Sequence, residues 1–196
     1  HYPLRRQRQM CIRDSYNKVI NNRQFGGLPV STFERSSGQR PFIPEGTLEL
    51  TREYERTMEF TVGGVEFELH HAKGETDDHT WTWIPQHKMI SAGYQLIWNF
   101  PNCGNPQKVQ RYPLEWADSL RKMMAKEVEL FVPAHGLPIT GHARITSCLD
   151  TVACTLEQLV KDFLEAMNAG ATLDEIVASV TVDPDVLELP YLRPLY

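Results

Sequence analysis

The spacing of hydrophobic residues changes along this chain, and that change limits what the chain can fold into. Between Met58 and Ala92 apolar and polar residues alternate, as they do in β-strands with one buried face. Between Val152 and Met167 apolar residues recur every three or four positions, as they do on one face of an α-helix. The sequence therefore predicts an α+β structure that ends in an all-helical segment.

The first part predicts hairpins of short strands. Two alternating runs flank Gly63-Gly64, and glycine readily adopts the positive φ that a tight hairpin turn requires. A second pair of runs flanks Pro85-Gln86-His87. In chain order, the further elements predicted are strands over residues 80–84 and 88–92, a helix over 114–126 and a strand over 129–133.

The helical end carries its own start and stop signals. Gly170 lies where a glycine ends a helix, and Thr172 with Glu175 forms a capping box for a second helix through Val180. Asp183-Pro184 begins a third helical turn. We place a domain boundary near Asp150, which gives domains over residues 22–149 and 150–196.

The amino-terminal residues differ from the rest of the chain. Residues 1–21 begin with an arginine-rich stretch that shows no periodicity and resembles translated sequencing-adapter sequence. We expect a non-native or disordered leader there, and a natural protein that continues upstream. Residues 22–56 give weak strand and helix signals and are expected to form a surface loop.

Composition excludes several kinds of partner. The formal net charge is −5 and no basic cluster lies in the main body, so no nucleic acid is expected to bind. No apolar run approaches the roughly 20 residues that span a bilayer. The four cysteines form no C-x-x-C pair and are expected to be free thiols. Both cytoplasm and periplasm remain open as locations.

The densest polar segment is residues 70–79, HHAKGETDDH, between two predicted strands. Imidazoles and carboxylates on a loop suit zinc or a similar divalent ion, although a solvated acidic turn would have the same composition. His135 stands in PAHGLP directly after the strand over residues 129–133. Two prolines and a glycine restrain this histidine more than a surface loop needs, which favours a metal ligand.

These segments carry a resemblance to a family. Residues 132–141, VPAHGLPITG, resemble the V-P-G-H-G-x-P-x-x-G motif of metallo-β-lactamase-fold hydrolases, and GETDDH over residues 74–79 takes the place of their G-H-T-x-G-H loop. The GETDDH variant is similar to the alkyl sulfatase branch. The resemblance continues over residues 99–102, 116–120, 167–175 and 190–194.

The resemblance implies part of an αββα sandwich with a metal site, usually of two zinc ions, at one edge. His79 would bind the first metal and His135 the second. Glu75 and Asp78 would be catalytic carboxylates beside His79, either supporting it or replacing a ligand; with Asp77, they could equally be solvated loop residues. Residues 150–196 would begin a helical dimerisation domain, which predicts a homodimer.

Two departures from the family pattern affect the metal site. The H-x-H-x-D-H motif, which supplies most ligands in this fold, does not occur in the sequence. Tyr94 follows Ala92-Gly93 where the family has an aspartate that bridges two metals. A phenol cannot bridge two zinc ions as a carboxylate does, so the second zinc is doubtful. Because the H-x-H-x-D-H ligands are also missing, the chain as it stands is expected to be inactive.

The function expected from the resemblance is zinc-dependent hydrolysis of a small-molecule sulfate ester of a hydrophobic alcohol. Two alternatives are another ester hydrolase of the same fold, acting on a thioester, lactone or phosphodiester, and a non-catalytic relative that has lost its metals. Trp81, Trp83 and Trp98 could line an apolar pocket for an alkyl chain, but packing in the core is the simpler interpretation.

Overall fold

The computed structural model describes residues 52–104 and 111–193. The leader over residues 1–21 and most of the loop predicted over residues 22–56 lie outside the described residues. The unit described below comprises the described residues from Tyr54 to Gly104 and from Arg111 to Arg193.

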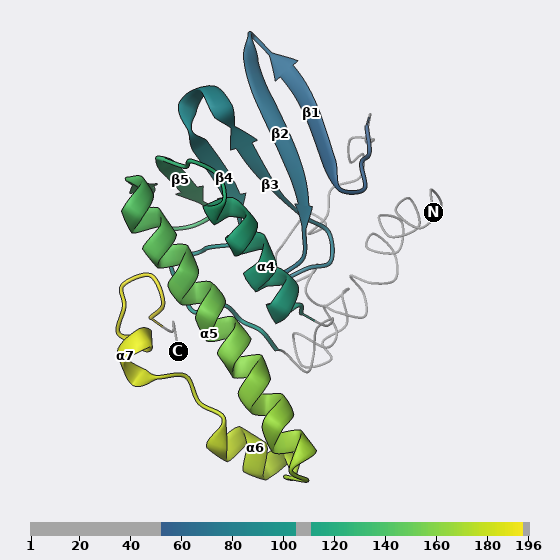
Figure 1. The fold of residues 1–196 in the computed structure, drawn as a ribbon, viewed down its shortest axis with the longest axis vertical. Helices are drawn as coiled ribbons and strands as arrows, with labels where there is room; N and C mark the ends of the chain where they lie inside the picture. Colours follow the sequence, from purple (N-terminus) through teal and green to yellow (C-terminus); the bar gives the residue numbers. More distant parts are fainter. Residues whose placement is uncertain (1–51, 105–110, 194–196) are drawn as a thin grey trace, which may run out of the picture. The chain divides into compact units, whose positions relative to one another are not determined.

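A six-stranded sheet forms one layer of this unit, with its strands in chain order from β1 to β6 (Figure 1). Every neighbouring pair is antiparallel except β4 and β5, which are parallel and are connected through helix α4. The strands are β1 Thr57–Val62, β2 Val65–Ala72, β3 His79–Ile84, β4 Met89–Gly93, β5 Leu130–Pro133 and β6 Ile139–Thr140.

Both predicted hairpins are confirmed. Val62 pairs with Val65 across Gly63-Gly64, whose φ values are +60° and +82°, as a tight turn requires. Strands β3 and β4 are joined by a 3-10 turn over Pro85–His87 that ends at Lys88. The two-residue strand β6 was not predicted, because a pair of residues carries no detectable alternation.

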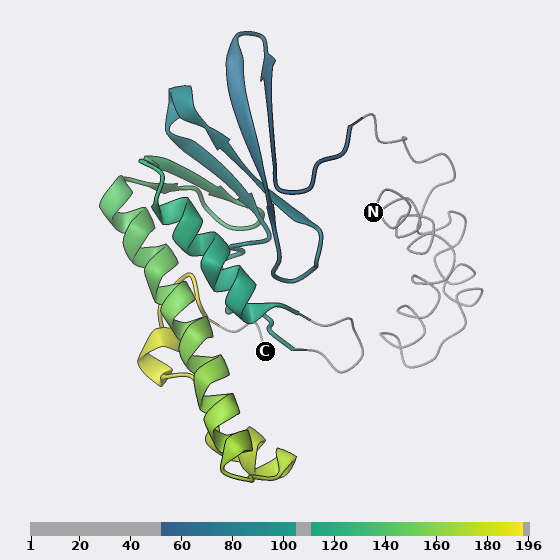
Figure 2. The same cartoon turned by 45° about the vertical axis from the view of Figure 1, so that its right-hand side comes forward.

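Helices α4 (Pro113–Met124) and α5 (His142–Asn168) pack against each other and cover one face of the sheet (Figures 1 and 2). Their contact with the sheet forms the core. Its largest fully buried apolar side chains are Trp81, Ile90, Leu96, Trp116, Leu120, Met123, Phe131, Ile145, Leu149, Leu156 and Leu192.

The apolar face of α4 agrees in part with the helical spacing of Leu114, Ala117, Leu120 and Met124 in the sequence. Ala117 and Leu120 are fully buried, whereas Leu114 is 49% exposed. The buried face runs through Trp116, Leu120 and Met123, so it is turned away from Leu114 around the helix axis.

Helix α5 begins ten residues before the periodic stretch that predicted it. The helix starts after Gly141 and runs without a break through Asp150, where a domain boundary was placed. Its first turns bury Ile145, Cys148 and Leu149 against the core, at the same helical spacing as the stretch that begins at Val152, so the sequence already carried the signal for the earlier start. The division into domains at residue 150 stays a prediction.

The helical end follows its predicted caps. Gly170 has φ +85° after α5, and Thr172 and Glu175 form the capping box of α6 (Leu173–Ser179). Asp183 caps α7 (Pro184–Leu187). No helix within the described residues is long and apolar enough to span a membrane.

Candidate functional site

One edge of the sheet collects three of the side chains that the sequence singled out. Because β4 and β5 are parallel, their carboxyl ends meet there, and the Ala134 N–H donates a hydrogen bond to the Gly93 carbonyl (3.0 Å). Strand β3 is antiparallel to β4, so its first residue, His79, lies at the same edge. The sheet therefore places His79, at the start of β3, and Tyr94 and His135, in the loops after β4 and β5, at the same edge.

His79 is held against the end of β4. Its Nε2 lies 3.2 Å from the Ala92 carbonyl. Its ring packs on Gly93, where a Cβ would lie 2.8 Å from that nitrogen. Burial lowers the pKa of His79 and outweighs three opposing effects, the Ala92 hydrogen bond and the charges of Glu75 and Asp78. The imidazole is therefore kept neutral, which is the form that binds metals.

His135 contacts the tyrosine that replaces the expected bridging aspartate. Its Nε2 is hydrogen-bonded to the Tyr94 hydroxyl at 3.2 Å, and the two rings meet edge to face with centroids 5.3 Å apart. Tyr94 is 46% exposed, so the pair lies at the surface of this edge. Tyr94 thus contacts one of the two imidazole nitrogens of the residue that the resemblance assigns to a metal.

Glu75 has a partner that the sequence did not reveal. Its carboxylate forms an ion pair with Arg111, whose side chain is only 3% exposed, whereas that of Glu75 is 29% exposed. Arg111 belongs to no motif, and nothing in the sequence pairs it with a loop more than thirty residues away. Asp78 is exposed and acts on His79 through its charge.

The side chains in the described part of the chain do not make up a metal site. Within residues 52–104 and 111–193, no three or more His, Cys, Asp or Glu side chains are grouped so that they could hold an ion. His79 and His135 supply two imidazoles, half of a tetrahedral zinc set, and both Nε2 atoms contact protein oxygens. A zinc site would need ligands beyond these.

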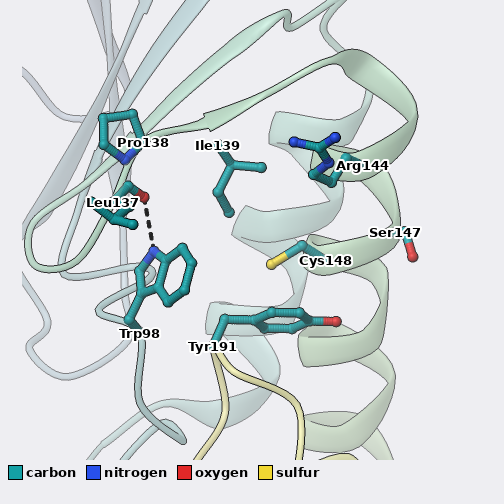
Figure 3. Close-up of a pocket in the computed structure, with 8 residues that line it drawn as sticks. All are labelled: Trp98, Leu137, Pro138, Ile139, Arg144, Ser147, Cys148 and Tyr191. Atoms are coloured by element: carbon teal, nitrogen blue, oxygen red, sulfur yellow. Dashed lines mark hydrogen bonds between the residues drawn. The ribbon is translucent and has the colours of Figure 1, made fainter.

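A cavity of about 410 Å³ lies beside the His135 loop (Figure 3). Trp98 forms one wall, and its indole N–H donates to the Leu137 carbonyl at 2.9 Å. The ring lies so close to Gly136 that a Cβ there would be 2.2 Å from Trp98 Cδ1. Trp81 and Trp83 are buried in the core, whereas Trp98 lines this cavity.

Known alkylsulfatases are similar to this chain in sequence and in fold. No family model matches the chain. A linear primary-alkylsulfatase of Pseudomonas sp. (strain ATCC 19151) is 26% identical over 169 residues, which cover 83% of this chain and 32% of that protein.

Solved structures of a sec-alkylsulfatase are also similar. The stereoselective inverting sec-alkylsulfatase Pisa1 from Pseudomonas sp. aligns with a TM-score of 0.63 and 24% identity over 79% of this chain and 24% of its own. A double mutant of the same enzyme gives a TM-score of 0.64 at 22% identity over 79% of this chain and 25% of its own. The chain thus spans about a third of the curated relative and a quarter of the solved sulfatase. Over that span it has the fold of the solved sec-alkylsulfatase, and its sequence is similar to that of a linear primary-alkylsulfatase, the family that the motifs around His79 and His135 resemble.

Proposed function

We propose that this chain is part of a hydrolase that cleaves sulfate esters of hydrophobic alcohols. The observation that carries the proposal is the convergence of His79 and His135 at one sheet edge, in a chain similar to an alkylsulfatase. Zinc is the proposed cofactor, with these two imidazoles among its ligands. Glu75 and Asp78, whose charges act on His79, are the carboxylates proposed to support the reaction.

Tyr94 supports a second candidate, a non-catalytic relative. Its hydroxyl engages His135, and no closed metal site exists among the side chains described here. The two candidates differ in what an added carboxylate at this position should do. In a hydrolase site it would complete a set of ligands with His79 and His135, whereas in a relative that has lost the geometry it would do nothing.

Zinc binding to the chain tests this difference. We expect weak binding by the natural chain, because two imidazoles are too few ligands, and at least tenfold tighter binding by Tyr94→Asp, because a carboxylate adds a third. Competition with a chromogenic chelator measures both affinities. Tyr94→Asn, of similar size but a poorer ligand, should leave the affinity unchanged.

His79→Ala introduced into Tyr94→Asp should abolish the gain. An unchanged zinc affinity in Tyr94→Asp would favour the non-catalytic relative. For the activity itself, sulfate release from decyl sulfate is compared with turnover of a thioester, a lactone and a phosphodiester, using the whole protein of which this chain is proposed to be part. Turnover of one of the other esters alone would replace the sulfatase proposal by the corresponding hydrolase.

We also propose that the helical end mediates a homodimer. Val152 and Leu156 are buried within the unit, but the distal part of the same stripe is exposed. Its exposed apolar side chains, together with those of α6, are Phe163, Leu164, Met167, Leu173 and Val177. Here α5 extends beyond the sheet with α6 at its end (Figures 1 and 2), so a second copy would find this surface uncovered.

Removing this apolar surface should weaken self-association. Burial contributes about 25 cal/mol per Å² of apolar area, so a charge at Met167 in a dimer interface opposes a large favourable term. We expect Met167→Asp to raise the dissociation constant of the dimer at least tenfold, as measured by light scattering over a dilution series. Asn168→Asp adds the same charge beside the stripe and should have little effect; a natural chain that is monomeric throughout would contradict the proposal.

A further inference from the structure

One carboxylate oxygen on strand β2 faces two basic side chains from different parts of the fold. The ammonium group of Lys126, in the connection between α4 and β5, lies 2.8 Å from Glu68 Oε2. The Nε2 atom of His70, two residues further along β2, lies 3.4 Å from the same oxygen. The ion pair between Lys126 and Glu68 joins the connection after α4 to a strand 58 residues away in the chain.

The imidazole of His70 is held beside Glu68. It is stacked on the Trp81 indole, with ring centroids 4.0 Å apart and an angle of 9° between the planes. Because Trp81 is 2% exposed in the core, it gives the imidazole a rigid support. The Nε2 atom of His70 is buried and has no hydrogen-bond partner among the described residues. A proton on this nitrogen would therefore create a cation that has the Glu68 carboxylate beside it.

The charges around His70 favour its neutral form at neutral pH. Burial has the largest effect and lowers the pKa of His70, and the positive charge of Lys126 lowers it further. Glu68 on the same strand and Glu59 on β1 raise the pKa but do not outweigh these effects. The pKa of Glu68 is itself lowered, first by its hydrogen bond to Lys126, so this carboxylate keeps its charge in weak acid.

The neighbouring elements do not offer Glu68 another partner. Strand β3 contributes rings, with Trp81 under His70 and the Trp83 ring centroid 5.9 Å from Lys126 Nζ. The cations on α4 and before β4 have carboxylates of their own: Arg121 with Glu157 and Asp150, Lys122 with Asp118, and Lys88 with Glu127.

We propose that His70 is a pH-sensitive switch for the ion pair that joins β2 to the connection after α4. With His70 neutral, Glu68 accepts from Lys126 and the ion pair holds. When His70 takes a proton from solvent, its Nε2–H donates to the same carboxylate oxygen, and repulsion between the two cations displaces Lys126. The switch involves no metal, so it does not rest on the proposed hydrolase.

The direction of the pH effect follows from the pKa of His70. In the unfolded chain this pKa returns to its ordinary value of 6.5, above the value in the folded chain. The unfolded chain therefore binds the proton more readily. The stability that comes from a neutral His70 is complete above this ordinary value and is lost as the pH falls through the lower pKa of the folded chain.

Amide hydrogen exchange on the natural chain at about pH 7.5 and about pH 5.0, corrected for the intrinsic rates, tests the proposal. The amides that report are those of Ala125, Lys126 and Val128, which donate hydrogen bonds within the connection after α4. We expect their protection to fall at least threefold at the lower pH. In His70→Gln, which cannot gain the proton, protection should be the same at both. His87→Gln changes an exposed histidine and should behave like the natural chain.

Lys126→Met tests the other partner of the switch. Without the cation, the pKa of His70, followed by NMR, should rise above that in the natural chain, and the protection of Ala125 and Val128 should no longer depend on pH. The urea midpoint should fall between the two pH values by more in the natural chain than in His70→Gln. A His70 that titrates at or above its ordinary pKa in the natural chain, or an equal loss of protection in the natural chain and His70→Gln, would overturn the proposal.

Discussion

Gly136→Ala is expected to destabilise the protein far more than Gly141→Ala, although the two glycines have almost the same φ, +93° and +90°. Alanine is strained at a positive φ at either position, by on the order of 1–3 kcal/mol. At Gly141 nothing lies within 4 Å of the added Cβ, so this backbone term is the whole cost. At Gly136 the Cβ would lie 2.2 Å from Trp98 Cδ1, and the indole must move.

Moving Trp98 adds to the cost at Gly136. The indole loses its hydrogen bond to Leu137, worth about 1 kcal/mol, and its packing in the cavity wall. We therefore expect a loss of about 3 kcal/mol or more in the free energy of unfolding, measured by urea denaturation. Trp98→Ala in the same chain should remove the clash, so that the double variant loses less than the sum of the single ones. Equal losses for Gly136→Ala and Gly141→Ala would contradict the contact between Gly136 and Trp98.

The second large effect is expected at Glu75. Glu75→Gln removes the negative charge that pairs with Arg111, and no other ion pair to this guanidinium, which is 3% exposed, is found within residues 52–104 and 111–193. Breaking such a pair on one side typically costs about 3–5 kcal/mol, because the remaining charge stays buried. Urea denaturation measures this loss directly and needs no assumption about activity.

Glu188→Gln provides the matched control for Glu75→Gln. Glu188 pairs with Arg193, and both side chains are exposed, 77% for Glu188 and 65% for Arg193. The free energy of unfolding should therefore fall by at most about 1 kcal/mol. Replacing Arg111 by methionine together with Glu75→Gln should recover part of the stability, since no charge is then left buried. If Glu75→Gln and Glu188→Gln cost the same, the Glu75–Arg111 pair does not stabilise the fold as described.

Local signals in the sequence predicted the parts of the fold that depend on local chemistry. Gly63-Gly64 specified a hairpin because only glycine reaches both φ values readily, and Thr172 with Glu175 specified a helix start because the capping box is a contact between near neighbours. His79 and His135 were found through motifs, and the sheet places them at the same edge.

The features that the sequence did not reveal depend on contacts between distant residues. Arg111 is a lone arginine until the fold brings it to Glu75. The positive φ of Trp98 follows from its fit against Gly136, which no local propensity encodes.

Because β4 pairs in parallel with β5, the candidate site forms only when the crossover connection between these two strands is also ordered. Ile90 pairs with Phe131, so the edge that carries His79, Tyr94 and His135 closes only after a long stretch of chain has been ordered. Loop-closure entropy opposes that step, and the hydrogen bonds at the edge are too few to offset it. The core beneath α4 must supply the driving force. No short peptide that carries either histidine motif can reproduce this edge, and any transplant of the site would have to include the crossover that closes it.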